Sequence, residues 1–124
     1  MSLYEQLGGE VELRAIIDDF IDRCFDDTMI GFLFLRAERE RIKRFEFQHA
    51  ARALGASLAY EGRPLDQAHR PHRILGGQFD RRRQILKDTL RDHSAPASVV
   101  EAWIGHQDGL RHLITRDPDS NCRD

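Results

Sequence analysis

Residues 56–77 read ASLAYEGRPLDQAHRPHRILGG, and this stretch is the most unusual part of the chain. Residues that interrupt helices are spread along it: Gly62, Pro64, Pro71, Gly76 and Gly77. They leave room for one short helical turn near residues 65–70, which carries His69. Long irregular segments in compact domains are uncommon and usually functional. The sequence therefore predicts a functional site beside this stretch.

Helical patterns lie on both sides of the irregular stretch. Apolar residues recur every three to four positions, which predicts four main helices, over residues 10–27, 37–54, 78–92 and 96–115. Gly8-Gly9 separates a short N-terminal turn from the first of them, and Gly76-Gly77 is interpreted as a second break. No alternating apolar run with hairpin signals occurs. The predicted fold class is therefore all-α.

The predicted helix over residues 37–54 has two apolar faces. Ile42, Phe45 and His49 share one face, and Phe47, Ala50, Ala51 and Leu54 share the other. A helix with two such faces covers the core with one of them and contacts something else with the other.

Length and composition exclude several classes of protein. The chain has 124 residues, of which 40% are hydrophobic and 32% charged, as in a single globular domain. We expect the domain to span residues 1–116 and a flexible tail to follow over 117–124. No apolar run approaches a membrane span, and the N-terminus lacks a signal peptide pattern, so we expect a cytoplasmic protein.

Charge and cysteine usage add to these exclusions. The formal net charge is −2, and the basic run over residues 36–44 is interrupted by Glu38 and Glu40, which argues against nucleic acid as a partner. Cys24 and Cys122 are too few for a disulfide scaffold or a thiolate zinc site. Cys24 lies on an apolar helix face, where we interpret it as an inert core residue.

The candidate chemistry centres on histidines. His69 can present a neutral imidazole to a metal or a haem iron, although a surface histidine fits the local pattern as well. Glu46 and His49 form a Glu-x-x-His pair, but a di-iron bundle needs two such pairs and two further glutamates. A zinc site from His69 and His72 with a third histidine stays open, because the spacing does not impose it.

The chain resembles the truncated haemoglobins over residues 3–114. The matching segments, in order, are LYEQLGG (3–9), FIDR (20–23), IGFLF (30–34), YEGRPLDQAH (60–69) and Phe79-Asp80. The resemblance implies a truncated globin-like two-over-two helical sandwich that binds haem b, with His69 as the iron ligand. It implies haem contacts from a wider set: Phe34, Ile42, Phe45, His49, Tyr60, Leu65, His69, Arg73 and Phe79. Tyr60, Arg63, Arg73 and Lys43 are candidates for the haem propionates, or are plain surface residues.

On the ligand side of the haem the chain departs from the family pattern. Many members have hydrogen-bonding residues where this chain has Ile21, Ile42 and Phe45. Such a bond to dioxygen contributes about 1.5–3 kcal/mol, which these side chains cannot supply. The predicted distal pocket consists of Ile21, Ile42, Phe45, Glu46 and His49, and is largely apolar. We expect it to favour carbon monoxide or nitric oxide relative to dioxygen.

Three functions follow as hypotheses. The first is a globin that coordinates iron through His69 and binds the diatomic ligands O2, CO and NO. The second is a haem-based redox enzyme or sensor that uses Glu46 and His49 as acid–base groups, with a redox partner. The third is a haem-free globin-fold module that binds another protein. His49 either meets the distal ligand, also as a sixth iron ligand, or points to the haem edge or solvent. The oligomeric state stays open.

Overall fold

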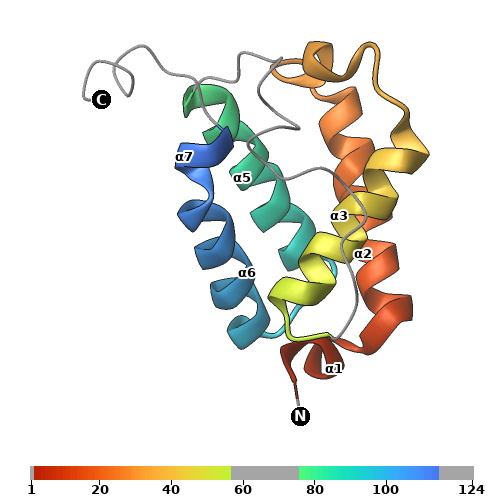
Figure 1. The fold of residues 1–124 in the computed structure, drawn as a ribbon, viewed down its shortest axis with the longest axis vertical. Coiled ribbons are helices and arrows are strands. Elements are labelled where there is room, and N and C mark those ends of the chain that lie inside the picture. Colours follow the sequence, from red (N-terminus) through yellow and green to blue (C-terminus); the bar gives the residue numbers. More distant parts are fainter. Residues whose placement is uncertain (1, 57–75, 115–124) are drawn as a thin grey trace.

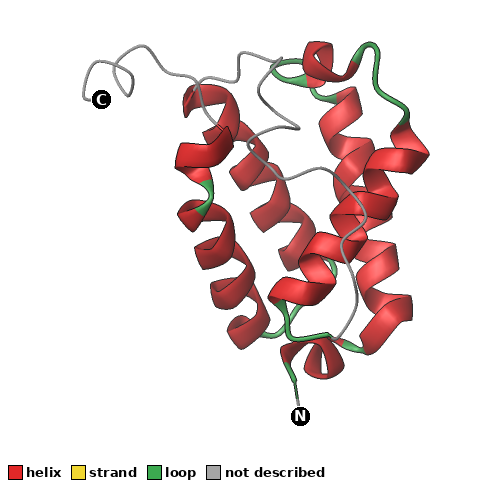
Figure 2. Cartoon of the chain, in the orientation of Figure 1, coloured by secondary structure: helices red, strands yellow, loops and turns green. Residues whose placement is uncertain are grey.

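The computed structural model describes residues 2–56 and 76–114, and this part of the chain contains helices and no strands (Figures 1 and 2). The elements follow in the order α1 (Leu3–Leu7), α2 (Gly9–Asp26), η1 (Gly31–Phe34), α3 (Arg39–Ala53), α5 (Gly76–Asp92), α6 (Ala97–Gly109) and α7 (Arg111–Ile114). η1 is a single 3-10 turn, and the others are α-helices. The predicted all-α fold class is confirmed.

The N-terminal turn and the first long helix are separated by Gly8, as predicted. Ser2 and Glu5 form a reciprocal capping box that starts α1. Gly8 then ends α1 and begins α2 with φ of 124°, a conformation that side chains with a Cβ rarely adopt. The chain can therefore turn sharply between the two helices.

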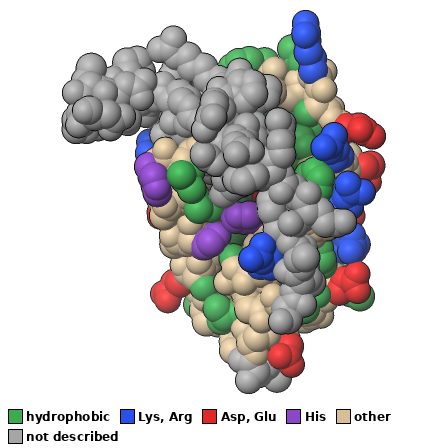
Figure 3. All heavy atoms as spheres, in the orientation of Figure 1, with side chains coloured by type: hydrophobic (Ala, Val, Ile, Leu, Met, Phe, Trp, Pro, Cys, Tyr) green, Lys and Arg blue, Asp and Glu red, His purple; other side chains and the backbone are tan. Residues whose placement is uncertain are grey.

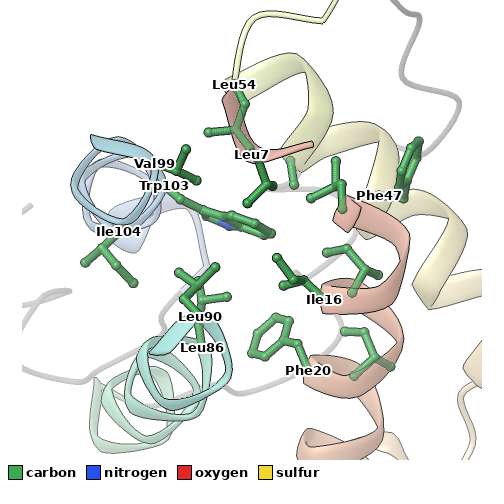
Figure 4. Close-up of a cluster of buried hydrophobic side chains, with 14 of the residues drawn as sticks. Leu7, Ile16, Phe20, Phe47, Leu54, Leu86, Leu90, Val99, Trp103 and Ile104 are labelled. Atoms are coloured by element: carbon green, nitrogen blue, oxygen red, sulfur yellow. The ribbon is translucent and has the colours of Figure 1, made fainter. Parts of the chain in front are cut away.

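The long helices form two pairs, α2 with α3 and α5 with α6, and α2 also packs on α5 (Figure 1). Their buried side chains form one core, and Trp103 of α6 lies in the middle of the cluster drawn in Figure 4. Phe20 of α2 and Leu90 of α5 are buried in the same cluster. Fully burying one such side chain contributes about 1.5–3 kcal/mol. This core holds α2, α3, α5 and α6 together.

Two helix boundaries differ from the sequence prediction. Gly76 and Gly77 were expected to break the chain, but they form the first turn of α5, where Gly76 is buried. The predicted helix over residues 96–115 is interrupted, because α6 ends at Gly109 and α7 begins at Arg111. Glycine has a low helix propensity, which explains why the helix ends there.

The interpretation of Cys24 as a core residue is confirmed. Its side chain is fully buried in α2, and burial raises the pKa of the thiol to about 12. At neutral pH the reactive thiolate is therefore scarce. Cys122 lies outside the described residues.

Candidate functional site

Helix α3 has two apolar faces, as predicted, and only one of them is fully buried. The buried face consists of Phe47, Ala50 and Ala51, continued by Leu54 just beyond the helix. On the second face Ile42, Phe45 and His49 are each half-buried. This second face therefore keeps part of its apolar surface outside the core that the described residues form.

The three apolar residues predicted for the distal pocket come from two neighbouring helices. Ile21 of α2 is buried in the core, and Ile42 of α3 packs against that core. Phe45 is flanked by two guanidinium groups, with Arg41 at 5.3 Å and Arg44 at 5.0 Å from the ring centroid. The side chains predicted to line the pocket are thus apolar on the α2 side and flanked by cations at Phe45.

A charged pair that the sequence analysis missed joins α3 to α5. Nη2 of Arg82 in α5 is 2.8 Å from Oε1 of Glu46, and Nη1 donates to Oε1 of Gln107 in α6 at 2.6 Å. The guanidinium carbon also lies 4.9 Å from the ring centroid of Phe20. The side chains of Arg82 and Glu46 are 19% and 28% exposed. Glu46, which the sequence predicts for the distal pocket, is therefore paired with a partly buried cation.

A signal for Arg82 was present in the sequence. Position 82 is three residues after Phe79 and four before Leu86, both of which point inward. An arginine on the apolar stripe of a helix needs a partner inside the protein. The pattern indicates that such a partner exists, but not which residue it is.

Two histidines lie beside this pair. The ring centroids of His49 and His106 are 5.3 Å apart, at an interplanar angle of 50°. Burial lowers the pKa of His49, and His106, Arg82 and Arg52 lower it further, while Glu46 opposes them. His49 is therefore neutral at neutral pH. Nε2 of His106 is buried without a hydrogen-bond partner among residues 2–56 and 76–114. Figure 3 shows histidine side chains together near the middle of the face drawn.

Two further residues predicted to contact haem lie in described parts of the chain. Phe34 of η1 is half-buried and stacks on Phe25, with ring centroids 4.8 Å apart. Phe79 of α5 is buried, and the guanidinium of Arg111 lies 5.1 Å from its ring centroid. Both aromatic side chains therefore already have partners within the protein.

Lys43, a propionate candidate, is engaged by acidic residues. Its Nζ lies 3.0 Å from Asp22, 3.6 Å from Asp18 and 3.5 Å from Glu40. Asp22 and Asp18 belong to α2, so Lys43 connects α3 to α2. This arrangement favours a structural role over propionate binding.

The remaining predicted residues lie outside the described residues: Tyr60, Arg63, Leu65, His69, His72 and Arg73. Within residues 2–56 and 76–114, no group of three or more His, Cys, Asp or Glu side chains is arranged to hold a metal ion. None of the helices that the structure describes is long and apolar enough to cross a membrane.

Comparison with known proteins identifies the family. The family model of the bacterial-like globins matches residues 2–116. The chain belongs to the bacterial-like globin family. A haem-binding function, in general terms, follows from membership of this globin family.

Curated relatives of this bacterial-like globin are group 1 truncated hemoglobins. The GlbN protein of Mycolicibacterium paratuberculosis is 27% identical over 104 residues, which cover 84% of this chain and 76% of the relative. The GlbN protein of Synechocystis is 26% identical over 103 residues, covering 80% and 83%. The resemblance stated from the sequence is thereby confirmed.

Solved structures show the same fold. The truncated hemoglobin of Tetrahymena pyriformis in its Fe(III) form matches with a TM-score of 0.86 at 20% identity, covering 93% of this chain and 98% of that one. The hemoglobin of Chloroflexus aurantiacus matches with a TM-score of 0.81 at 24% identity, covering 94% and 99%. A 2/2 hemoglobin from Synechococcus, described with covalently attached heme, has a TM-score of 0.81 at 19% identity, covering 91% and 95%. The two-over-two globin fold of this chain is therefore established.

The described residues fit a haem group. A haem needs apolar side chains against its faces and has few polar requirements inside the protein. The second face of α3 supplies half-buried Ile42 and Phe45, and Nε2 of His106 is buried with no hydrogen-bond partner among the described residues. These features are compatible with a bound cofactor.

Proposed function

We propose that this globin binds haem b through His69 and binds a diatomic gas beside Ile21 and the second face of α3. When bound, the haem supplies an iron with one coordination position for such a ligand. The observation that carries the proposal is the second face of α3, because its apolar residues are only half-buried while those of the first face form the core.

Different residues of the chain coordinate the iron, contact the haem and line the ligand side. The resemblance to truncated haemoglobins assigns His69 to the iron, with Tyr60, Leu65 and Arg73 around the haem. Ile21 and Ile42 exclude water from the ligand side and supply no hydrogen bond. Phe45 adds an aromatic face, and His49 borders the pocket as a neutral imidazole.

A haem-based redox enzyme or sensor is a second candidate, and the lowered pKa of His49 favours it. A neutral imidazole can accept a proton at neutral pH. Glu46 is less suited to the acid–base role proposed for it, because its carboxylate is held by Arg82 at 2.8 Å. Under this alternative, His49→Ala keeps haem and loses turnover by about 10²–10⁴-fold.

Titration of the purified chain with haemin tests the proposal. We expect a Soret band that saturates at one haem per chain. Replacing His69 by alanine removes the ligand, so haem affinity falls at least about tenfold, which is 1.4 kcal/mol. His72→Ala is the matched control, because it removes an imidazole three residues away, and it leaves the affinity unchanged.

Two outcomes would contradict the proposal. If the wild-type chain develops no Soret band, the haem-free interaction module is the better description. If His69→Ala binds haem as tightly as the wild type, another residue coordinates the iron.

A further inference from the structure

We propose that Arg82 is a ligand-binding residue of the haem pocket, and that it stabilises small inorganic anions bound there. This inference rests on the proposed haem function. It adds to the apolar wall of Ile21 and Ile42 a hydrogen-bond donor that comes from α5.

The position of Arg82 follows from its contacts. Its ion-pair partner Glu46 is four residues after Ile42 and three before His49, so these three residues share one face of α3. The guanidinium also lies against the ring of Phe20, the residue before Ile21 on α2. The cation therefore stands where α2, α3 and α5 meet, beside the residues of the predicted ligand pocket.

The guanidinium keeps donors for a ligand. An arginine has five N–H donors, arranged in a planar fork. Within the described residues, Nη1 donates to Gln107 and Nη2 to Glu46, and no bond from Nε is among the contacts of Arg82. Three of the five N–H groups thus have no acceptor among the described residues and can donate to a ligand.

The same contacts hold Arg82 in place. Gln107 of α6 and Glu46 of α3 accept from two different nitrogens of one guanidinium, which restricts its rotation. A group that is already ordered loses little conformational freedom when a ligand arrives. The two acceptors therefore order the guanidinium of Arg82 in a way that favours ligand binding as well as protein stability.

The charge of Arg82 indicates that the ligand it favours is an anion. Guanidinium is charged at every accessible pH and forms stronger hydrogen bonds with anions than with neutral acceptors. His106, next to Gln107 in sequence, has a buried Nε2 with no partner in the described part of the chain, which adds a second polar atom to the cluster. We therefore expect a small anion such as fluoride or cyanide to benefit more than uncharged carbon monoxide.

Fluoride binding to the ferric, haem-loaded chain tests the role of Arg82. Arg82→Gln alone would strand the Glu46 carboxylate, so Glu46→Gln is compared with the double variant Glu46→Gln/Arg82→Gln. Glu46→Gln removes a negative charge beside the ligand, and we expect it to bind fluoride more tightly than the wild type. The double variant also loses the guanidinium, and we expect its affinity to be at least about tenfold weaker than that of Glu46→Gln.

Arg83→Gln is the matched control. Arg83 is the next residue of α5, and its guanidinium pairs with Asp108 at 2.7 Å near the surface. We expect its fluoride affinity to equal that of the wild type. If the double variant binds fluoride like Glu46→Gln while its Soret band is intact, the role of Arg82 is refuted and haem binding stands. A wild-type chain without a Soret band refutes both.

A second measurement needs only the near-isosteric Glu46→Gln variant. Carbon monoxide bound to the reconstituted protein has an infrared stretching frequency that falls as the potential at its oxygen becomes more positive. We expect Glu46→Gln to lower this frequency, because the charge of Arg82 is then no longer compensated. A frequency and a fluoride affinity that both equal the wild-type values place the charged pair away from the ligand and overturn the inference.

Discussion

Three consecutive arginines in α5 have three different partners. Arg81 bonds Asp27 at the end of α2 at 2.7 Å, Arg82 bonds Glu46 at 2.8 Å, and Arg83 bonds Asp108 of α6 at 2.7 Å. Successive residues of a helix point about 100° apart, so one short run reaches three neighbouring segments. Of these three arginines, only Arg82 pairs with a residue predicted for the ligand pocket.

His49 makes stability depend on pH. Its pKa is below the ordinary 6.5 when the protein is folded, because of burial and of the nearby His106, Arg82 and Arg52, with Glu46 opposing. The unfolded chain binds the proton more readily than the folded protein. The free energy of unfolding is therefore unaffected by His49 above the unfolded pKa and decreases as pH falls below that pKa. We expect the free energy of unfolding to fall between about pH 7.5 and pH 5.5.

Urea unfolding at both pH values measures this effect. In His49→Gln the decrease is smaller, because the titrating group is absent. His112→Gln removes an exposed histidine of α7 and serves as the control, with the decrease unchanged. A decrease of equal size in the wild type and in His49→Gln would show that other groups cause it.

At the scale of the element, the turn after α2 depends on close backbone packing. The carboxylate of Asp27 accepts from the backbone N–H groups of Met29 and Ile30 at 2.9 and 3.1 Å. A Cβ on Gly31 would lie 2.6 Å from the carbonyl oxygen of Phe25, which is backbone and cannot rotate away. Glycine is therefore required where η1 begins.

We expect Gly31→Ala to destabilise the protein by about 1–3 kcal/mol, because the turn must shift to admit the methyl group. Gly105→Ala is the control, since a Cβ there has nothing within 4 Å and lies inside α6. The gain in helix propensity should make it more stable by about 0.5–1 kcal/mol. Thermal unfolding of both variants measures the difference, and equal effects would contradict this account of the turn.

The elements were predictable from the sequence to different degrees. The helical spacing of Leu13, Ile16, Ile17 and Phe20 predicts α2, and two apolar stripes predict both faces of α3. The break at Leu110 was missed, because the apolar spacing continues across it. Gly76-Gly77 was wrongly interpreted as a break, because local propensity does not include the packing that buries Gly76.

The candidate site was predictable only where it lies on one element. Ile42, Phe45, Glu46 and His49 share a helix face, so their proximity follows from periodicity. The bond from Arg82 to Glu46 joins residues 36 positions apart. Charge pairing over such a distance depends on how the helices pack, so the position of Arg82 on an apolar stripe indicates a partner without identifying Glu46.

At the scale of the whole molecule, the two helix pairs build one core and leave a second apolar face on α3. The fold is that of truncated hemoglobins, as the Tetrahymena pyriformis structure shows with a TM-score of 0.86. The family explains why a small domain keeps apolar surface out of its own core. We infer that this surface covers a haem whose iron is held by His69.

The most direct test is haem binding by His69→Gly with and without free imidazole. The glycine leaves space for imidazole to replace the missing side chain. We predict that the variant shows a weak Soret band alone and regains the wild-type spectrum and haem affinity when imidazole is added. A wild-type spectrum and affinity in His69→Gly without imidazole would contradict the claim.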